Sequence, residues 1–492
     1  MKNKDIFQHP DLYVRQSAQM GVIMSKKKLG LGSAMAVCIG LIVATSCLLS
    51  LGKGMGLAGK GFIIPMFIVV VLNILLALSF SELHGIMPGV EGGLGQYTLV
   101  GLGPLPSIVS NLSAYVVTNI LAGAVEMAMC GMVLNQIFFK QVPPLVISLV
   151  ILVFLALVNF LGIDIFAKIQ NLVVTLLLGS LSLLGIISAF KLGTGTVIEA
   201  AVQTQPVVTG VSGIVSLSAL AFWLFIGIEF VIPISKDLKR PKRDVPLAMI
   251  LGIIILFIVQ SLLGIGMTNY VTLEELMTSD VPHMIFAENV LGKAGSYWMG
   301  IVTILAGVST INTLLGSITR ILSGMAEAGM MPDIFQKKNG RGTPVAGLVV
   351  MVAAISVNLM TGFATSSGLT NLLLAASCFW LTSYILVNIT VLVLRKRYPN
   401  AEGRNKKLTL LGIPQIICIV GDVFMIWNIA EGDDRIFIYK IFLVLFAILL
   451  VYAFIWVKAV KKVPAFKCAT LDEINNVKLE GEAGYEKSLQ ST

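Results

Sequence analysis

Long apolar stretches, separated by short polar segments, run through the chain from residue 29 to about residue 460. A helix needs about 20 mostly apolar residues to cross the hydrocarbon core of a bilayer. Twelve stretches have about that length, so we predict an all-α protein with twelve transmembrane helices. The predicted helices are 31–52, 61–84, 106–135, 144–162, 165–191, 213–234, 245–270, 295–323, 344–363, 367–395, 408–430 and 436–460.

The first stretch has small and hydroxyl-bearing residues near its middle. Ala44, Thr45 and Ser46 follow Gly40, and three more glycines come at positions 52, 54 and 56. Small residues let helix backbones approach closely in any membrane bundle, and glycine also weakens a helix. A break in this helix is therefore one interpretation of the pattern, and close packing alone is the other.

The sixth stretch holds a carboxylate and a glycine in the middle of an apolar run. Trp223, Gly227 and Glu229 lie within 211–234, and a strongly basic segment follows. A charged side chain at mid-depth costs about 2.5–3.5 kcal/mol on insertion scales. We therefore expect Glu229 to face protein, water or ligand rather than lipid.

The positions of the two unusual stretches predict internal symmetry. Interrupted helices five spans apart are typical of two five-helix inverted repeats, with a binding site where the breaks meet near the middle of the membrane. The matched pair, together with the charged sixth stretch, favours this arrangement over close packing alone. Two further helices would then lie outside the repeats.

Composition and charge support a membrane protein with a defined orientation. Of 492 residues, 56% are hydrophobic and 12% are charged, which excludes an ordinary soluble domain. The net charge of +9 comes largely from short loops, so it indicates topology rather than nucleic-acid binding. Loops on one side are basic (236–243, 337–341, 395–407, 458–462), and those on the other are acidic (274–288, 431–434). The loop 85–105 lacks Lys and Arg and does not bear on orientation. We expect both termini in the cytoplasm and the protein in the cell membrane.

Other chemistries have no signature in the sequence. The six cysteines show no CxxC spacing, and five of them lie inside apolar stretches, as small buried residues do. There is no Gly-rich phosphate loop, zinc-ligand spacing or nucleophile–base set. We therefore predict neither an enzyme nor a bound cofactor.

Several segments resemble one transporter family, the amino acid–polyamine–organocation permeases, over about residues 29–400. Residues 222–229 (FWLFIGIE) and 239–246 (KRPKRDVP) are similar to its sixth helix and the exit from it, in particular in the arginine/agmatine antiporter branch. Further similar segments are 79–83 (SFSEL), 92–97 (GGLGQY), 318–332 (ITRILSGMAEAGMMP) and 342–346 (GTPVA). The motifs are specific for the family and uninformative about the substrate.

The resemblance implies a five-plus-five inverted repeat, the leucine-transporter-like fold, with two accessory helices. It divides the chain into a cytoplasmic leader (1–28), a transport core (29–400), accessory helices (401–461) and a cytoplasmic tail (462–492) that we expect to be disordered. In the family, backbone N–H groups at the first break bind a substrate carboxylate, and carbonyls at the second bind its amine. This agrees with the polarity of helix ends.

The resemblance also implies substrate-binding residues. They are Ala44, Thr45, Ser46, Tyr115, Trp223, Ile226 and Gly227, with Trp223 stacking on the substrate. The chain departs from the family at Ala44-Thr45-Ser46, where a Gly-Ser-Gly run is usual. The added side chains would narrow the pocket, so an amine or amino alcohol without a carboxylate stays open beside an α-amino acid.

Coupling and gating residues are a further expectation. Glu229 could couple protons or gate, or serve as a structural carboxylate; Glu126 could handle protons or only form buried hydrogen bonds. Ser309 and Thr310 resemble a hydroxyl pair that ligates Na⁺ in related transporters, although hydroxyls also bond to their own helix. Leu177 stands where some proton-coupled members have lysine.

These features predict a secondary-active amino acid permease that works by alternating access, as a cation symporter or a substrate exchanger. An ethanolamine- or polyamine-type amine permease of the same family is the first alternative. A non-transporting substrate sensor on the same fold is the second. The sequence leaves monomer and homodimer equally open.

Overall fold

Helices account for most of the described chain. The computed structural model describes residues 29–472, except 89, 91–93, 163–164, 200–202, 204, 233–234, 236–237, 328, 363–367 and 405–409. The predicted leader and residues 473–492 lie outside the described residues. In the described part, two isolated bridges are the only β-type pairings. The protein is all-helical there, as predicted.

Most predicted stretches correspond to one long helix, and two are divided into pieces. The divided ones are α2 (Leu31–Ile42) with α3 (Thr45–Ala58), and α10 (Gly210–Ser216), α11 (Ser218–Phe222), η3 (Trp223–Phe225) and η4 (Ile228–Val231). The other helices are η1 (Gly59–Phe62), α4 (Ile63–Ile86), α5 (Leu94–Leu102), α6 (Pro104–Asn111), η2 (Leu112–Val117), α7 (Thr118–Ile137), α8 (Pro144–Phe160), α9 (Ile165–Ala189), α12 (Pro241–Tyr270), α13 (Leu273–Thr278), α14 (Pro282–Leu291), α15 (Lys293–Glu327), η6 (Asp333–Gln336), α16 (Val345–Met360), α17 (Gly368–Arg397), η8 (Leu410–Gly412), α18 (Ile413–Trp427), α19 (Gly432–Ile455) and η9 (Trp456–Val460).

Length and composition identify eight helical stretches, among the described residues, that could cross a membrane. Four shorter apolar helices accompany them: Leu31–Gly40, Pro144–Phe160, Val345–Met360 and Ile413–Trp427. The protein is therefore a multi-pass membrane protein. A total of twelve crossings and the inverted repeat stay predictions.

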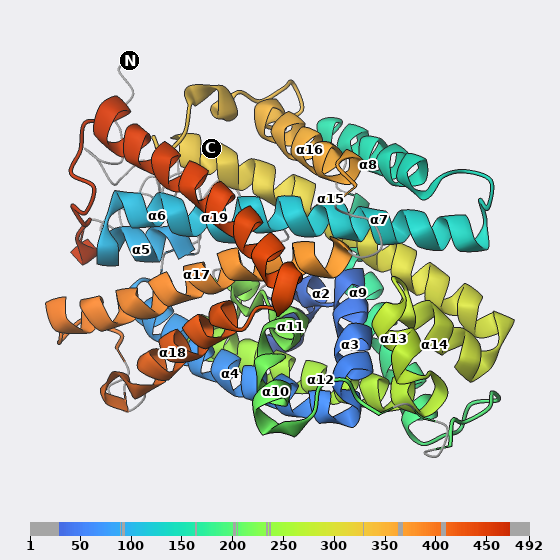
Figure 1. Cartoon of the computed structure of the whole chain (residues 1–492). Coiled ribbons are helices and arrows are strands. Elements are labelled where there is room, and N and C mark those ends of the chain that lie inside the picture. The colour runs from blue at the N-terminus through green and yellow to red at the C-terminus, as the bar shows by residue number, and fades with distance from the viewer. Residues whose placement is uncertain are drawn as a thin grey trace.

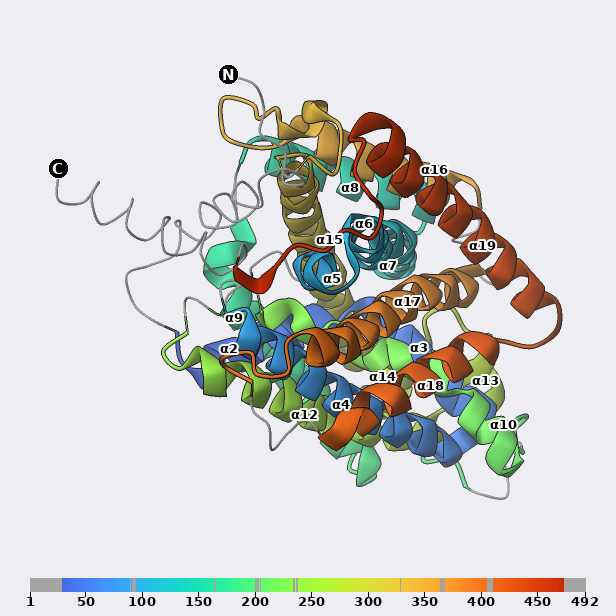
Figure 2. The same ribbon diagram turned by 90° about the vertical axis from the view of Figure 1, so that its left-hand side faces the viewer.

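The divided helices lie in the interior. In both views α2 and α3 lie between a layer that contains α7 and α17 and a layer that contains α4 and α12 (Figures 1 and 2). α15 packs along α7, and η4 packs against α2. Backbone at a helix break has unpaired polar groups, which lipid cannot satisfy. An interior position is therefore where a broken helix is tolerated.

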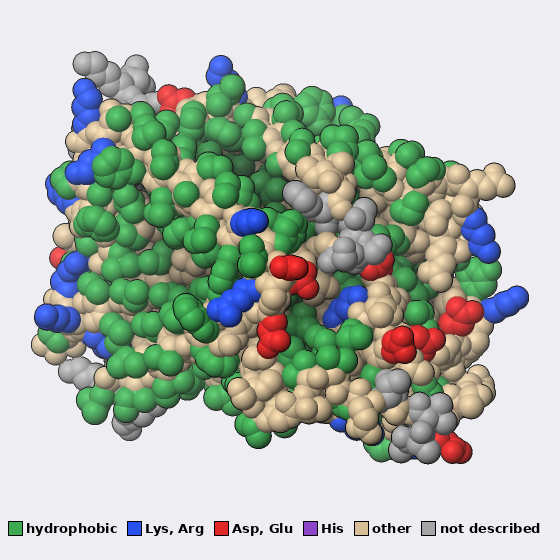
Figure 3. Space-filling model, viewed as in Figure 1, with side chains coloured by type: hydrophobic (Ala, Val, Ile, Leu, Met, Phe, Trp, Pro, Cys, Tyr) green, Lys and Arg blue, Asp and Glu red, His purple; other side chains and the backbone are tan. Residues whose placement is uncertain are grey.

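The surface is apolar where lipid would contact it. Large hydrophobic side chains cover the outer faces of α8, α18 and α19, among them Phe154, Val420, Trp427 and Val451. In Figure 3, Lys and Arg side chains gather along the left edge, and most of the visible Asp and Glu side chains lie in the middle and right half. Lys and Arg side chains also lie in the middle and at the right edge, so the left edge is the more uniformly basic one.

One ion-pair cluster joins helix ends at the basic end of the bundle. Arg395 of α17 binds the Glu82 carboxylate of α4 through two of its nitrogens, and Arg404 lies 3.0 Å from the same carboxylate. Nearby, Arg397 donates to the carbonyl of Val100 in α5, at 2.9 Å. Glu82, the carboxylate of the 79–83 motif, therefore has a structural role: it holds the end of α4 against the end of α17.

Candidate functional site

The first break exposes a helix N-terminus inside the protein. α2 ends at Ile42, the next two residues leave the helical conformation, and α3 begins at Thr45. Ala44 is extended, with φ −103° and ψ 161°. The first N–H groups of a helix have no partner within it, and the helix dipole makes that end favourable for an anion. The break therefore creates an anion-binding end at the centre of the bundle.

Glu126 of α7 occupies this anion-binding end. Its two carboxylate oxygens accept hydrogen bonds from the backbone N–H of Thr45, at 3.1 Å, and of Ser46, at 2.9 Å. Glu126 is 2% exposed. Hydrogen bonds to an ionised acceptor are about twice as strong as neutral ones. Glu126 thus caps α3 from a helix that lies about 80 residues further along the chain.

The second break depends on a glycine. Ile226 is extended, and Gly227 has φ +100°, a conformation that residues with a β-carbon rarely adopt. Ile226 and Gly227 therefore separate the carbonyl end of η3 from the amide end of η4. Local sequence explains this break: Gly227 is the one residue between Ser218 and Phe230 without a side chain.

Glu229 fastens α17 to the second break. Its carboxylate accepts hydrogen bonds from Trp380 Nε1, at 3.1 Å, and from the Tyr384 hydroxyl, at 2.8 Å. The same hydroxyl accepts a hydrogen bond from Gly227 N, at 3.3 Å. The structural role considered for Glu229 is therefore present: besides a backbone N–H of its own residue, its carboxylate binds two side chains of α17.

Trp223 joins the two breaks. Its indole Nε1 donates to the hydroxyl of Ser46, at 2.8 Å, and Cys47 Sγ lies 3.5 Å from the Trp223 carbonyl oxygen. Ser50 also donates to the Leu220 carbonyl, at 2.7 Å. Trp223 is 5% exposed, and Thr45 and Ser46 are fully buried. The conformation is therefore closed around the breaks.

An aromatic cluster lies beside the second break. The ring centroids of Tyr115, Phe230 and Trp380 are 5.8 to 6.3 Å apart, in edge-to-face geometry. Such contacts contribute about 0.5–1.5 kcal/mol each beyond area burial. Tyr115 was expected at the site; Phe230, Trp380 and Tyr384 were missed. The available signal was the i, i+4 spacing of Trp380 and Tyr384, which places them on one face of a helix.

The expected Na⁺ pair lies on the helix that runs past the first break. Thr45 Oγ1 donates to the carbonyl of Thr303 in α15, at 3.1 Å. Ser309 and Thr310 are about two turns further along α15; Ser309 is buried, and Thr310 is half-buried. Leu177 is buried in α9. Among the described residues, no group of three or more His, Cys, Asp or Glu side chains could hold a metal ion.

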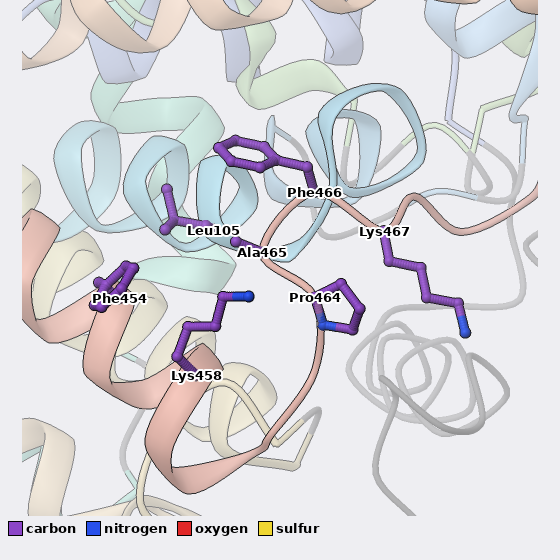
Figure 4. Close-up of a pocket in the computed structure, with 7 residues that line it drawn as sticks. All are labelled: Leu105, Phe454, Lys458, Pro464, Ala465, Phe466 and Lys467. Carbon is purple, nitrogen blue, oxygen red and sulfur yellow. The ribbon is translucent and has the colours of Figure 1, made fainter.

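Two cavities lie between described residues and can be compared with the helix breaks. One of about 10 Å³ lies between Asp422, Asn73, Phe222 and Tyr384, and can hold about one water molecule. The other has about 640 Å³ and lies at the surface, between α6, α19 and residues 464–467 (Figure 4). None of the expected substrate-binding residues lines either cavity.

Comparison with known proteins identifies the family. A sequence model described as amino acid permease matches residues 29–468, which is most of the chain. The chain belongs to the amino acid permease family. The resemblance found in the sequence motifs is thereby confirmed.

Two relatives illustrate the range of named activities. A branched-chain amino acid permease of Bacillus subtilis is 25% identical over 84% of this chain and 90% of its own length. An arginine/ornithine antiporter of Latilactobacillus sakei is 25% identical over 79% of this chain and 85% of its own. Members of this family are amino acid transporters in membranes, and the prediction that the chain is not an enzyme is confirmed.

A solved structure shows the same kind of fold. It is a mutant of the manganese transporter of Eremococcus coleocola, with a TM-score of 0.58 and 15% identity. The match covers 89% of this chain and 99% of that one. The family and this match support a transporter fold for most of the chain.

Proposed function

We propose that the protein is a secondary-active amino acid permease whose substrate binds where the two helix breaks meet. The observation that carries the proposal is the pair of hydrogen bonds from Thr45 N and Ser46 N to a carboxylate. In the closed conformation that carboxylate is the side chain of Glu126. The α-carboxylate of an amino acid has the same two oxygens and the same charge, so it fits the same N–H groups.

Substrate binding would then require Glu126 to leave the first break. A substrate carboxylate would bind the amides of Thr45 and Ser46, beside Ala44, and the carbonyls released at Ile226 and Gly227 would face its ammonium group. Two ionised carboxylates cannot share one small anion site. Glu126 is therefore a gating group in this proposal: it stabilises the empty site and gives way to the substrate.

The aromatic residues supply the two gates of an alternating-access cycle. Trp223 covers the first break on the side of α3, and Tyr115, with its aromatic neighbours, closes the side of the second break. Glu229 keeps α17 on that gate through Trp380 and Tyr384. By the positive-inside bias, the basic end of the bundle faces the cytoplasm of a cell-membrane protein.

Counterflow in liposomes tests the proposed function. Purified protein is reconstituted into vesicles that are loaded with an unlabelled amino acid, and entry of the same labelled amino acid is followed. Branched-chain and cationic amino acids are the first candidates, because relatives are named for them. We expect labelled amino acid to accumulate transiently. Saturable binding without any flux would instead identify a sensor.

An amine permease is the second candidate, and Glu126 is the observation that favours it. Because the anion-binding end already holds a carboxylate, a substrate without one could bind without displacing Glu126. Ethanolamine and putrescine belong in the same counterflow assay. Flux of these amines, in the absence of amino acid flux, would decide for this alternative.

Sodium coupling is a separate proposal that rests on Ser309 and Thr310. If their oxygens ligate Na⁺, replacing Na⁺ by choline should lower initial uptake about tenfold, and Ser309→Ala with Thr310→Ala should raise the Na⁺ concentration for half-maximal uptake. A change of about 1.4 kcal/mol in ion binding corresponds to about tenfold. Ser296→Ala, near the start of α15, is the matched control. Uptake that is unchanged in choline but abolished by a protonophore would eliminate the sodium site.

A further inference from the structure

The surface cavity of about 640 Å³ is lined by apolar side chains and two lysines. Phe454 from α19, Leu105 from α6 and Phe466 surround it, and Lys458 reaches across it toward Ala465 (Figure 4). Residues 464–467, here called the strap, form its outer side. The cavity thus combines apolar walls with an ammonium group.

The strap is held in place although it belongs to the region expected to be a disordered tail. The N–H of Leu105 donates to the Ala465 carbonyl, at 3.1 Å, and Val463 N donates to the Val457 carbonyl, at 3.1 Å. Ala465 is 6% exposed. Gly103, with φ +97°, permits the close approach, because a β-carbon there would lie 2.7 Å from the Phe466 backbone. Backbone contacts therefore fix the outer side of the cavity.

The charged residues that line the cavity, among those the structure describes, are both lysines. Residues 458–467 contain four lysines, at 458, 461, 462 and 467, and no acidic residue. Lys458 and Lys467 line the cavity, and Lys461 lies over the Trp456 ring, 5.7 Å from its centroid. A ligand that fills the cavity beside these lysines should carry negative charge.

The apolar side of the cavity continues into the lipid-facing surface of α19. Val444, Ile448, Val451 and Ile455 are each more than half exposed, and their spacing of three or four residues places them on one helix face. Phe454 is 55% exposed next to them. Trp456 stacks on Tyr452 at the same end of α19, as aromatic residues do at a membrane interface.

We propose that this cavity binds an anionic phospholipid. Its phosphate lies beside Lys458, the glycerol region fills the space beside Leu105 and Phe466, and one acyl chain follows the exposed face of α19. The apolar walls and their continuity with the lipid surface select a phospholipid over a soluble phosphate. The bound lipid joins α19, the strap and α6, and so stabilises the basic end of the bundle.

Lipid retention by the full-length protein tests this site. Detergent-purified protein is titrated with phosphatidylglycerol, phosphatidylcholine or glycerol 3-phosphate and studied by native mass spectrometry and thermal unfolding. We expect one phosphatidylglycerol to be retained and to raise the unfolding midpoint, whereas the other two compounds leave the midpoint unchanged. Midpoints that rise equally with phosphatidylcholine or with glycerol 3-phosphate would overturn the proposal.

Three variants separate the cavity from general attraction to a basic surface. Lys458→Ala with Lys467→Ala should lower retention of phosphatidylglycerol at least about threefold. Lys242→Ala with Arg243→Ala removes the same charge at exposed positions elsewhere and should not lower it. Leu105→Trp keeps both lysines but fills the cavity, and should lower retention as the lysine variant does.

Two results would contradict the lipid site. Equal loss in the two charge variants would show non-specific attraction, and full retention in Leu105→Trp would show that the cavity is not the site. If Leu105→Trp does not fold, Lys458→Glu, at an exposed position, takes its place as the second test. Unchanged retention in Lys458→Glu would likewise overturn the proposal. Transport assays do not enter the decision, so this site and the proposed transport function fail separately.

Discussion

Replacing Trp223 by alanine should raise the substrate concentration for half-maximal transport by more than about tenfold. Removing a buried Trp costs about 3–5 kcal/mol in a packed core, and this indole also loses its hydrogen bond to the Ser46 hydroxyl. Part of this lost free energy would destabilise the substrate-bound conformation, in which Trp223 covers the site. Initial rates of uptake in proteoliposomes, over a range of substrate concentrations, measure the effect.

Trp223→Phe separates the ring from its hydrogen bond. It keeps an aromatic face but removes the N–H that Ser46 accepts, a loss of about 1 kcal/mol, so the half-saturating concentration should rise only about fivefold. Unchanged affinity in Trp223→Ala would remove Trp223 from the substrate site. Equal effects of the two substitutions would assign the role to the hydrogen bond alone.

Replacing Glu126 by glutamine should lower the stability of the empty protein and strengthen its response to an amino acid. The amide has one acceptor oxygen where the carboxylate had two, so one of the N–H groups of Thr45 and Ser46 loses its acceptor. A buried donor without a partner costs about 1–3 kcal/mol. Because the competing anion is also gone, a substrate carboxylate should bind more tightly. Thermal unfolding in detergent, with and without amino acid, measures both effects.

Glu229→Gln is the matched control for Glu126. Glu229 is also a buried carboxylate, but its side-chain donors are Trp380 and Tyr384 of α17, and it does not bind the N–H groups of Thr45 and Ser46. We expect a lower midpoint without a larger ligand-induced shift. A ligand-induced shift in Glu126→Gln that is no larger than the shift in Glu229→Gln would contradict displacement of Glu126 by the substrate.

The second break could be located from the sequence because its cause is local. Gly227 adopts a backbone conformation that favours glycine, and an apolar run around it made the interruption visible. The Ala44-Thr45-Ser46 run was ambiguous between a break and close packing, and the structure shows that the helix is interrupted at Val43 and Ala44. The second unusual helix therefore followed from short-range features, and the first also needed the pairing of the two stretches five spans apart.

The partners of the buried carboxylates could not be located in the same way. Glu126 was recognised as an intramembrane acid, but its contact with Thr45 and Ser46 depends on how α7 packs against α3. Glu229 meets residues more than 150 positions away. No periodicity within a helix specifies which neighbouring helix its polar side chain will contact.

The strap differs from the disordered tail that we expected there, for another reason. Residues 462–472 are polar enough to suggest a disordered tail, yet backbone hydrogen bonds and the glycine at 103 hold part of this segment on the α5–α6 turn. Composition describes a segment as a whole. It does not reveal the two or three backbone contacts that order this segment. Residues 473–492 lie outside the described part of the chain.

The central claim is that the N–H groups at the first break recognise the carboxylate of the transported amino acid. Titration calorimetry of the purified protein tests it most directly, with a transported amino acid, its α-amide and its decarboxylated amine compared under one condition. The account predicts that the amino acid binds at least about tenfold more tightly than both analogues, since only it can replace Glu126 on Thr45 N and Ser46 N. Binding of the amide or the amine as tight as that of the amino acid would contradict it.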